Sequence, residues 1–191
     1  MINSEPSSLS EAKRFVALDR DGTLIVERHR PINKIVDVKL IPGVVKALQY
    51  LDTLKIGLLV ITNQSGVGRG TLSHNELDKI HSHLMNMLAL EGIQIQGIYS
   101  CTHAPWDDCG CRKPLPGLLE QAATEHGFTS SDLYMIGDKA SDIRCGRSFG
   151  AKTILVRTGY GKSEESISVN IADHIVEDLI EAAIVIERDA I

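Results

Sequence analysis

Short apolar runs alternate with longer amphipathic segments along most of this chain. The apolar runs lie at residues 15–18, 57–61, 98–100, 133–136 and 153–156. Strands of a parallel sheet have this composition when helices cover both faces of the sheet. Parallel strands also need crossover connections, and amphipathic helices are the usual ones. The pattern therefore predicts an α/β fold, a Rossmann-like doubly wound parallel sheet.

The clearest of the predicted helices begins near Ser73. Ser73 and Glu76 have the spacing of a capping box, in which the two side chains satisfy free amides of the first turn. One face of this helix then carries Leu77, Ile80, His81, Leu84, Met85 and Leu88, up to Gly92. We expect His81 and His83 to be structural or solvated. Other helices are expected at residues 44–55, 117–126 with Gly127 as C-cap, 142–149 and 179–187.

Length and composition are those of an ordinary globular protein. The chain has 191 residues, 43% hydrophobic and 24% charged, which predicts a single domain at residues 12–191 after a flexible N-terminus at residues 1–11. We see no apolar signal core and no apolar stretch of the roughly 18–20 residues that a membrane helix needs, so we expect a cytoplasmic protein. The net charge of −5 disfavours nucleic acid or an anionic membrane as partner. We expect a monomer that acts on a small anionic molecule.

Polar residues follow several of the predicted strands at their carboxyl ends. Asp19 follows the first strand, Thr62 ends the second and Asp138 follows the fourth. Open α/β sheets bind their ligands at this edge. Residues that are far apart in the sequence are therefore expected to converge on one site.

The residues at this edge have the chemistry of phosphoryl transfer. Asp19 and Asp21 form a carboxylate pair before Gly22, and Asp138 with Asp142 would complete a Mg²⁺ site. Thr62 offers a hydroxyl. Lys113 offers an ammonium, with Arg112 beside it. Taken singly, these segments could be a surface turn, a strand terminus, a solvated basic pair and a capped helix start; their fixed order favours a catalytic site. A Ca²⁺ loop of the EF-hand kind is excluded, since its twelfth position would be Arg30 instead of glutamate.

A compact run of metal-binding residues lies between the second and third of these motifs. Cys101, His103, Cys109 and Cys111 have a spacing that suits one tetrahedral Zn²⁺. Four protein ligands leave no open coordination position, so we expect a structural zinc rather than a catalytic one. Cys145 falls in a predicted helix and is expected to be a small buried side chain.

Together, residues 19–23, 62–66, 111–114 and 137–139 resemble the motifs of the haloacid dehalogenase (HAD) superfamily. The resemblance extends over about residues 15–161. Within the superfamily, the chain is similar to the small branch of heptose-bisphosphate and histidinol-phosphate phosphatases. This resemblance implies a HAD fold without a large cap domain and with a zinc loop at residues 101–111. The wording of residues 62–70 and 112–117 resembles the heptose enzymes, whereas the short zinc loop resembles the histidinol enzymes.

The resemblance also implies a role for each motif residue. Asp19 would be the nucleophile, Asp21 the general acid and base, and Thr62 and Lys113 would stabilise the transferred phosphoryl group. Mg²⁺ would be held by Asp19, by the Asp21 carbonyl and by Asp138, with Asp142 in the surrounding shell. Expected substrate contacts are Arg20, Glu27, Arg30, Asn63, Gln64, Ser65, Arg69, Arg112 and Lys139. Arg112 and Arg69 would hold the distal phosphate of a bisphosphate.

The expected activity is therefore Mg²⁺-dependent hydrolysis of a phosphomonoester through an aspartyl-phosphate. The expected substrate is a heptose 1,7-bisphosphate, which would lose its 7-phosphate. Histidinol phosphate or another small sugar phosphate is the alternative within the same fold. A zinc-bearing binding module without catalysis is the alternative from another class.

Overall fold

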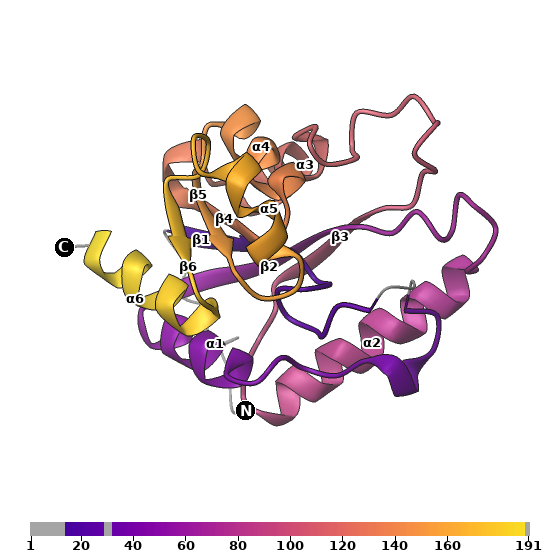
Figure 1. The fold of residues 1–191 in the computed structure, drawn as a ribbon. Helices are drawn as coiled ribbons and strands as arrows, with labels where there is room; N and C mark the ends of the chain where they lie inside the picture. The colour runs from indigo at the N-terminus through magenta and orange to yellow at the C-terminus, as the bar shows by residue number, and fades with distance from the viewer. Residues whose placement is uncertain (1–13, 29–31, 190–191) are drawn as a thin grey trace, which may run out of the picture.

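The computed structural model describes residues 14–28 and 32–189 and contains a six-stranded parallel sheet between two layers of helices (Figure 1). Its strands are β1 (Arg14–Leu18), β2 (Ile56–Asn63), β3 (Gly97–Cys101), β4 (Leu133–Gly137), β5 (Lys152–Val156) and β6 (His174–Val176). They lie in the order β3-β2-β1-β4-β5-β6, so the direction of winding reverses at β1. This confirms the predicted doubly wound α/β fold.

Helices cover both faces of the sheet. Successive residues of each strand point to opposite faces, so the apolar strands supply side chains to a core on each side. The helices are α1 (Val44–Thr53), α2 (His74–Leu90), α3 (Gly117–His126), α4 (Ala140–Phe149), α5 (Gly161–Ser168) and α6 (Leu179–Asp189), with short 3₁₀ turns η1 (Ile35–Asp37) and η2 (Ser130–Asp132). Val16 and Leu18 pack with α1, α2 and α6 in one core cluster. Phe15 and Ala17 pack in the other, with α3 and Cys145 of α4. The buried strands therefore read as continuous apolar runs.

The structure corrects several predicted boundaries. Helix α1 ends at Thr53 because Lys55 has a left-handed backbone, with φ of 60°. Helix α4 begins at Ala140 rather than Asp142, whose carboxylate caps the helix by accepting a hydrogen bond from the Lys139 amide. Strand β2 continues one residue past Thr62. The Ser73 capping box and the Gly127 C-cap are confirmed.

The C-terminal part contains two elements that the sequence analysis did not predict. Helix α5 is mostly polar and exposes Ile167, so it lacks a clear apolar stripe. Strand β6 has three residues and pairs with β5 at the edge of the sheet. Short edge elements give too few positions for a period to be recognised.

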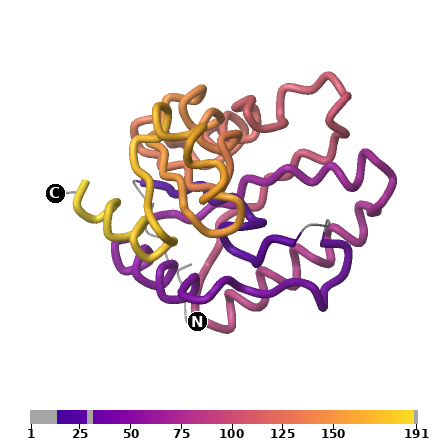
Figure 2. Tube along the Cα trace, in the orientation of Figure 1, coloured from indigo at the N-terminus to yellow at the C-terminus, as the bar shows by residue number. Residues whose placement is uncertain are grey.

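Two loops extend beyond the carboxyl end of the sheet at β2 and β3 (Figure 2). They cover residues 64–73 and 102–116 and are joined by the hydrogen bond from the Gly68 amide to the Thr102 carbonyl, 2.8 Å. Among the described residues no large cap domain is inserted into the fold, and no helix is long and apolar enough to cross a membrane. The expected flexible segment at residues 1–11 lies outside the described residues.

Candidate active site

The predicted catalytic residues converge beside β1, where the order in which successive strands are added to the sheet reverses. Strand β1 pairs with β2 on one side and with β4 on the other. Asp19, Thr62 and Asp138 therefore lie together at the carboxyl edge, and the Asp19 amide donates to the Ile136 carbonyl at 2.9 Å. Asp19, Thr62 and Asp138 are 5%, 1% and 0% exposed. The site thus rests on the rigid ends of central strands.

Lys113 joins the nucleophile candidate to the rest of the site. Its ammonium lies 2.7 Å from Asp19 Oδ1, 2.6 Å from Asp142 Oδ1 and 2.7 Å from the Ile61 carbonyl. Burial alone would lower the pKa of this lysine, but the carboxylates of Asp142 and Asp19 raise it. Asn63 fixes the backbone of Lys113 by two reciprocal hydrogen bonds of 3.0 and 3.1 Å. Lys113 is therefore held as a cation that faces two carboxylates.

Asp138 is a buried carboxylate whose Oδ1 lies 3.9 Å from the Lys139 ammonium. Its Oδ2 accepts a hydrogen bond from the Tyr160 amide at 2.8 Å, whereas Oδ1 has no hydrogen-bond partner among the described residues. Burial and the neighbouring Asp19 raise the pKa of Asp138 to about 8. Gly22 and Gly159 have positive φ angles of 86° and 55°, and a Cβ at either would collide with Asp138 Oδ2. The backbone therefore encloses this carboxylate closely.

This arrangement fits a magnesium ion. Asp19, Asp138 and Asp142 each offer a carboxylate oxygen, and these oxygens lie within 4.8 Å of one another. Mg²⁺ prefers such oxygen ligands, and it would give Asp138 Oδ1, which accepts no hydrogen bond from the described residues, a direct partner. Both oxygens of Asp142 are already engaged, by the ammonium of Lys113 and the amide of Lys139. The place of Asp142 outside the direct ligand set stays a prediction.

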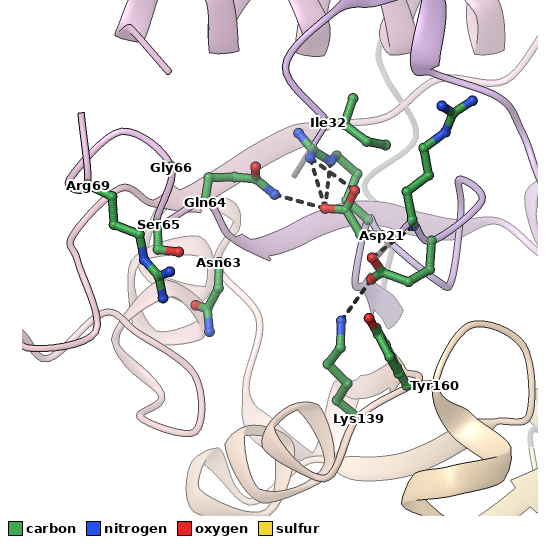
Figure 3. Close-up of a pocket in the computed structure, with 12 residues that line it drawn as sticks. Asp21, Ile32, Asn63, Gln64, Ser65, Gly66, Arg69, Lys139 and Tyr160 are labelled. Atoms are coloured by element: carbon green, nitrogen blue, oxygen red, sulfur yellow. Dashed lines mark hydrogen bonds and ion pairs between the residues drawn. The ribbon is translucent and has the colours of Figure 1, made fainter. Parts of the chain in front are cut away.

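The Asp21 carboxylate is held by two side chains (Figure 3). Arg20 donates to it from Nε at 3.1 Å and from Nη2 at 2.8 and 3.1 Å. Gln64 donates from Nε2 both to Asp21 Oδ2 and to Thr62 Oγ1, each at 2.9 Å. Asp21 is thereby oriented from both sides and linked to Thr62.

Two adjoining cavities share the lining residues Asp21, Asn63 and Lys139. The inner cavity, about 60 Å³, is lined by Asp19, Asp21, Thr62, Asn63, Lys113, Lys139, Ser141 and Asp142. The outer cavity, about 470 Å³, is lined by Arg20, Asp21, Glu27, Arg28, Ile32, Asn63, Gln64, Ser65, Gly66, Arg69, Lys139 and Tyr160. One water needs on the order of 10–15 Å³ of such space, so the inner cavity has room for one phosphoryl group. The outer cavity has the size of a small-ligand site.

The structure brings most of the predicted substrate contacts to the outer cavity, but not all of them. Arg112 does not line either cavity, and its Nη1 is buried without a hydrogen-bond partner among the described residues. Arg30 lies outside the described residues. Tyr160 was missed, although it follows the predicted strand at 153–156 and so lies at the carboxyl edge. Ser141 was also missed as a lining residue, although it lies within the Asp138–Asp142 motif.

Most cations of the outer cavity already have a carboxylate partner. Arg20 binds Asp21, Arg28 binds Asp37 at 2.7 Å, and Lys139 binds Glu27 at 3.0 Å while its ammonium lies over the Tyr160 ring. Arg69 is the exception among the described residues that line this cavity. Its guanidinium lies 5.8 Å from the centre of the Trp106 ring and pairs with no carboxylate. Arg69 is therefore available to an anion.

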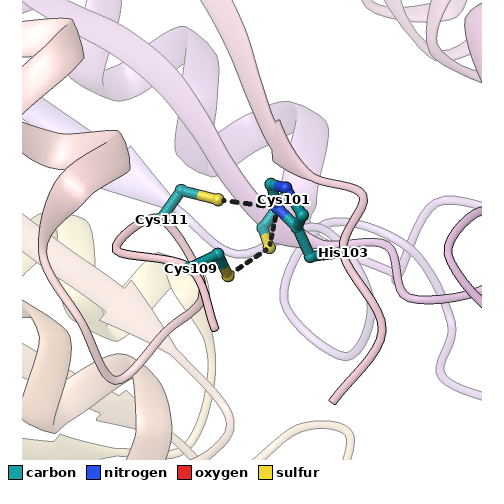
Figure 4. Close-up of side chains that lie close together, drawn as sticks. All are labelled: Cys101, His103, Cys109 and Cys111. Carbon is teal, nitrogen blue, oxygen red and sulfur yellow. Dashed lines mark hydrogen bonds between the residues drawn. The ribbon is translucent and has the colours of Figure 1, made fainter. Parts of the chain in front are cut away.

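The four predicted zinc ligands converge at the end of β3 (Figure 4). Cys101 Sγ lies 3.7 Å from His103 Nδ1 and 3.9 Å from Cys109 Sγ, and His103 Nδ1 lies 3.2 Å from Cys111 Sγ. Zinc bonds of ~2.3 Å to sulfur and ~2.0 Å to nitrogen imply tetrahedron edges of about 3.5–3.8 Å. Burial and the neighbouring thiols raise the pKa of Cys111 to about 12, so a cation would stabilise the thiolates together. The cluster fits Zn²⁺ and lacks the ~2.05 Å sulfur separation of a disulfide.

Known proteins are similar to this chain over the segments that carry these residues. A family model described as HAD-hydrolase-like matches residues 110–182, which include Lys113, Asp138 and Asp142. Fold and site together define a phosphatase of the HAD class.

Curated relatives indicate which phosphatases of the HAD class this chain is similar to. The D-glycero-β-D-manno-heptose-1,7-bisphosphate 7-phosphatase of Haemophilus influenzae is 34% identical over 184 residues, covering 92% of this chain and 97% of the relative. That of Pasteurella multocida is 36% identical over 160 residues, covering 80% and 86%. The D,D-heptose 1,7-bisphosphate phosphatase of B. bronchiseptica, solved with magnesium and phosphate, has a TM-score of 0.87 at 28% identity, covering 92% of this chain and 99% of that one. The chain belongs to the family of HAD-like phosphatases that these relatives represent.

Proposed function

We propose that this phosphatase removes the 7-phosphate of D-glycero-β-D-manno-heptose 1,7-bisphosphate through an aspartyl-phosphate on Asp19. The observation that carries the proposal is the junction of the two cavities. An inner cavity large enough for a phosphoryl group contains Asp19 and Lys113, and the adjoining outer cavity contains the unpaired Arg69. The sugar and its second phosphate would occupy the outer cavity.

In the proposed first step, a carboxylate oxygen of Asp19 attacks phosphorus in line with the sugar oxygen. The new bond joins Asp19 to phosphorus, and the bond from phosphorus to the sugar oxygen breaks. Asp21 donates a proton to the departing oxygen. This role fits a carboxyl group that lines both cavities, since the scissile bond would lie where they meet.

In the second step, water attacks the phosphorus of the aspartyl-phosphate, and Asp21 takes up the proton that the water loses. Asp19 is released as a carboxylate and inorganic phosphate leaves. Lys113 and the hydroxyl of Thr62 would stabilise the charge on the phosphoryl oxygens in both steps. Lys113 would also reduce repulsion between Asp19 and its dianionic target.

Two metals are proposed as cofactors. Asp19, Asp138 and the Asp21 carbonyl would hold Mg²⁺, which neutralises phosphoryl charge when it is bound. Cys101, His103, Cys109 and Cys111 would hold a structural Zn²⁺. The thiol cluster favours a reducing compartment, and we propose the cytoplasm. The monomeric state stays a prediction that size-exclusion chromatography with light scattering can check.

For the distal phosphate, the geometry favours Arg69 over Arg112. Arg69 lines the outer cavity and has no carboxylate partner there, whereas Arg112 does not line it. Replacing Arg69 by alanine should therefore reduce kcat/KM for the bisphosphate by roughly tenfold or more, the scale of a charge-assisted hydrogen bond of ~1.5–3 kcal/mol. A monophosphate without the distal group should lose much less. Arg112→Ala serves as the matched variant.

The experiment is a kinetic panel of the two heptose 1,7-bisphosphate anomers, heptose 7-phosphate, histidinol phosphate and other sugar phosphates. The β bisphosphate should have the highest kcat/KM, and Arg69→Ala should be selective for the bisphosphates. A preference for histidinol phosphate would contradict the substrate assignment and favour the enzymes that the short zinc loop resembles. Lack of phosphate release from every substrate and from an aryl phosphate would favour a binding module.

A further inference from the structure

A histidine on helix α2 contacts Arg20, the residue between Asp19 and Asp21. His81 Nε2 lies 3.2 Å from Nη1 of Arg20, which stands between the two catalytic aspartates in the sequence. The His81 side chain is half-buried, and burial together with the charge of Arg20 lowers its pKa to about 4. A neutral imidazole can accept a hydrogen bond, and a guanidinium can only donate. His81 therefore accepts from Arg20 and carries its own proton on Nδ1.

The guanidinium of Arg20 links His81 to Asp21. The arginine is 1% exposed, and its three nitrogen atoms are divided between two partners. Nη1 faces His81, while Nε and Nη2 bind the Asp21 carboxylate. Because the guanidinium is planar and rigid, a partner on Nη1 fixes the plane in which the other nitrogens meet Asp21.

We propose that His81 is a positioning residue for the general acid and base, acting on Asp21 through Arg20. This inference rests on the proposed function. His81 does not line either cavity, so it needs no contact with substrate. Without His81 as acceptor, the buried Nη1 would lose its hydrogen-bond partner. Rotating the guanidinium toward another acceptor would break the hydrogen bonds from Nε and Nη2 to the Asp21 carboxylate. Gln64 would then hold Asp21 alone, from one side.

A misplaced Asp21 has a specific kinetic signature. A poor leaving group, such as a sugar alkoxide, needs the proton, whereas nitrophenolate leaves with little protonation. Loss of the His81 contact should therefore slow aspartyl-phosphate formation on alkyl phosphates more than on p-nitrophenyl phosphate. General damage to the fold would slow both alike.

The test compares His81→Phe and His81→Met, which remove the acceptor, with His81→Gln, which can supply one. Single-turnover rates of phosphoenzyme formation are measured with glycerol 3-phosphate and with p-nitrophenyl phosphate. For Phe or Met we expect a loss of roughly tenfold or more on the alkyl phosphate, part of the ~10²–10⁴ that proton transfer contributes, and a clearly smaller loss on the aryl phosphate. Gln should recover most of the alkyl rate. His83→Phe, on the same helix, controls for changing a helix histidine.

Equal losses on both substrates, no loss on either, or a Gln variant as slow as Phe would overturn the inference. If one of the two acceptor-free variants does not fold, the other still gives the comparison. Failure of the proposed aspartyl-phosphate mechanism is distinguishable, since the unmodified enzyme would then form no phosphoenzyme with either substrate. A wrong substrate assignment would leave this comparison of leaving groups unchanged.

Discussion

Removing the buried ammonium of Lys113 should destabilise this protein far more than removing a surface lysine. Lys113 is 4% exposed and lies within 2.7 Å of Asp19, Asp142 and the Ile61 carbonyl. Lys113→Met keeps an unbranched side chain one atom shorter than lysine, and it leaves two buried carboxylates without their shared cation. Breaking a buried ion pair from one side costs about 3–5 kcal/mol. This is a large part of a total stability of about 5–15 kcal/mol.

The matched control is Lys152→Met. Lys152 pairs with Asp189 at 2.8 Å, but its side chain is 53% exposed, and an exposed pair is worth about 0–1 kcal/mol. For a chain of this length, 1 kcal/mol shifts Tm by about 2–4 °C. Without Mg²⁺, we therefore expect a loss of about 6–20 °C for Lys113→Met and at most about 4 °C for Lys152→Met.

Scanning calorimetry or denaturant titration with and without Mg²⁺ measures both variants. Added Mg²⁺ should recover part of the loss in Lys113→Met, because it neutralises the same carboxylates. Equal destabilisation by the two substitutions without Mg²⁺ would refute the reasoning that Lys113 holds together a charged site.

Two further predictions concern the metals. Cys109→Ser should lower the zinc content and Tm before it slows the chemical step, whereas Cys145→Ser should keep its zinc. Plasma emission spectroscopy measures the zinc content of the two variants. A full zinc content in Cys109→Ser would contradict the assignment of Cys109 as a zinc ligand. The pKa of Asp138, about 8 instead of 3.8, means that the folded metal-free protein holds an extra proton between these values, so its stability should fall as pH rises through that window. Mg²⁺ must displace this proton, and its stabilising effect on Tm should be larger at about pH 8.5 than at about pH 6; an equal shift would argue against Asp138 as ligand.

Features with a clear local signal were predictable from the sequence. The strand ends at Asp19, Thr62 and Asp138 follow from apolar runs bounded by polar motifs, and the rule for open sheets brings them together. The cysteine and histidine spacing predicted a cluster that the structure confirms as a geometric arrangement. These signals are local or depend only on topology.

Side-chain partners were beyond prediction because they depend on packing between distant elements. His81 was expected to be structural or solvated, and nothing in its apolar stripe indicates that it faces Arg20, 61 residues away. Arg69 and Arg112 looked equivalent beside their motifs, yet Arg69 alone lines the outer cavity. Tyr160 lies at the start of α5, and it was missed because the weak hydrophobic pattern of α5 gave no signal for that helix.

The central claim is the covalent intermediate on Asp19, and trapping it is the most direct measurement. Asp21→Asn should slow breakdown of the intermediate, since the amide cannot take a proton from water. Incubation with p-nitrophenyl phosphate, reduction of the acyl phosphate with borohydride and peptide mass spectrometry would locate it. We expect reductive conversion of Asp19 to homoserine in this variant, and no such product when Asp19→Asn is added. Reduction at another carboxylate, or turnover by Asp19→Asn alone at an unchanged rate, would contradict it.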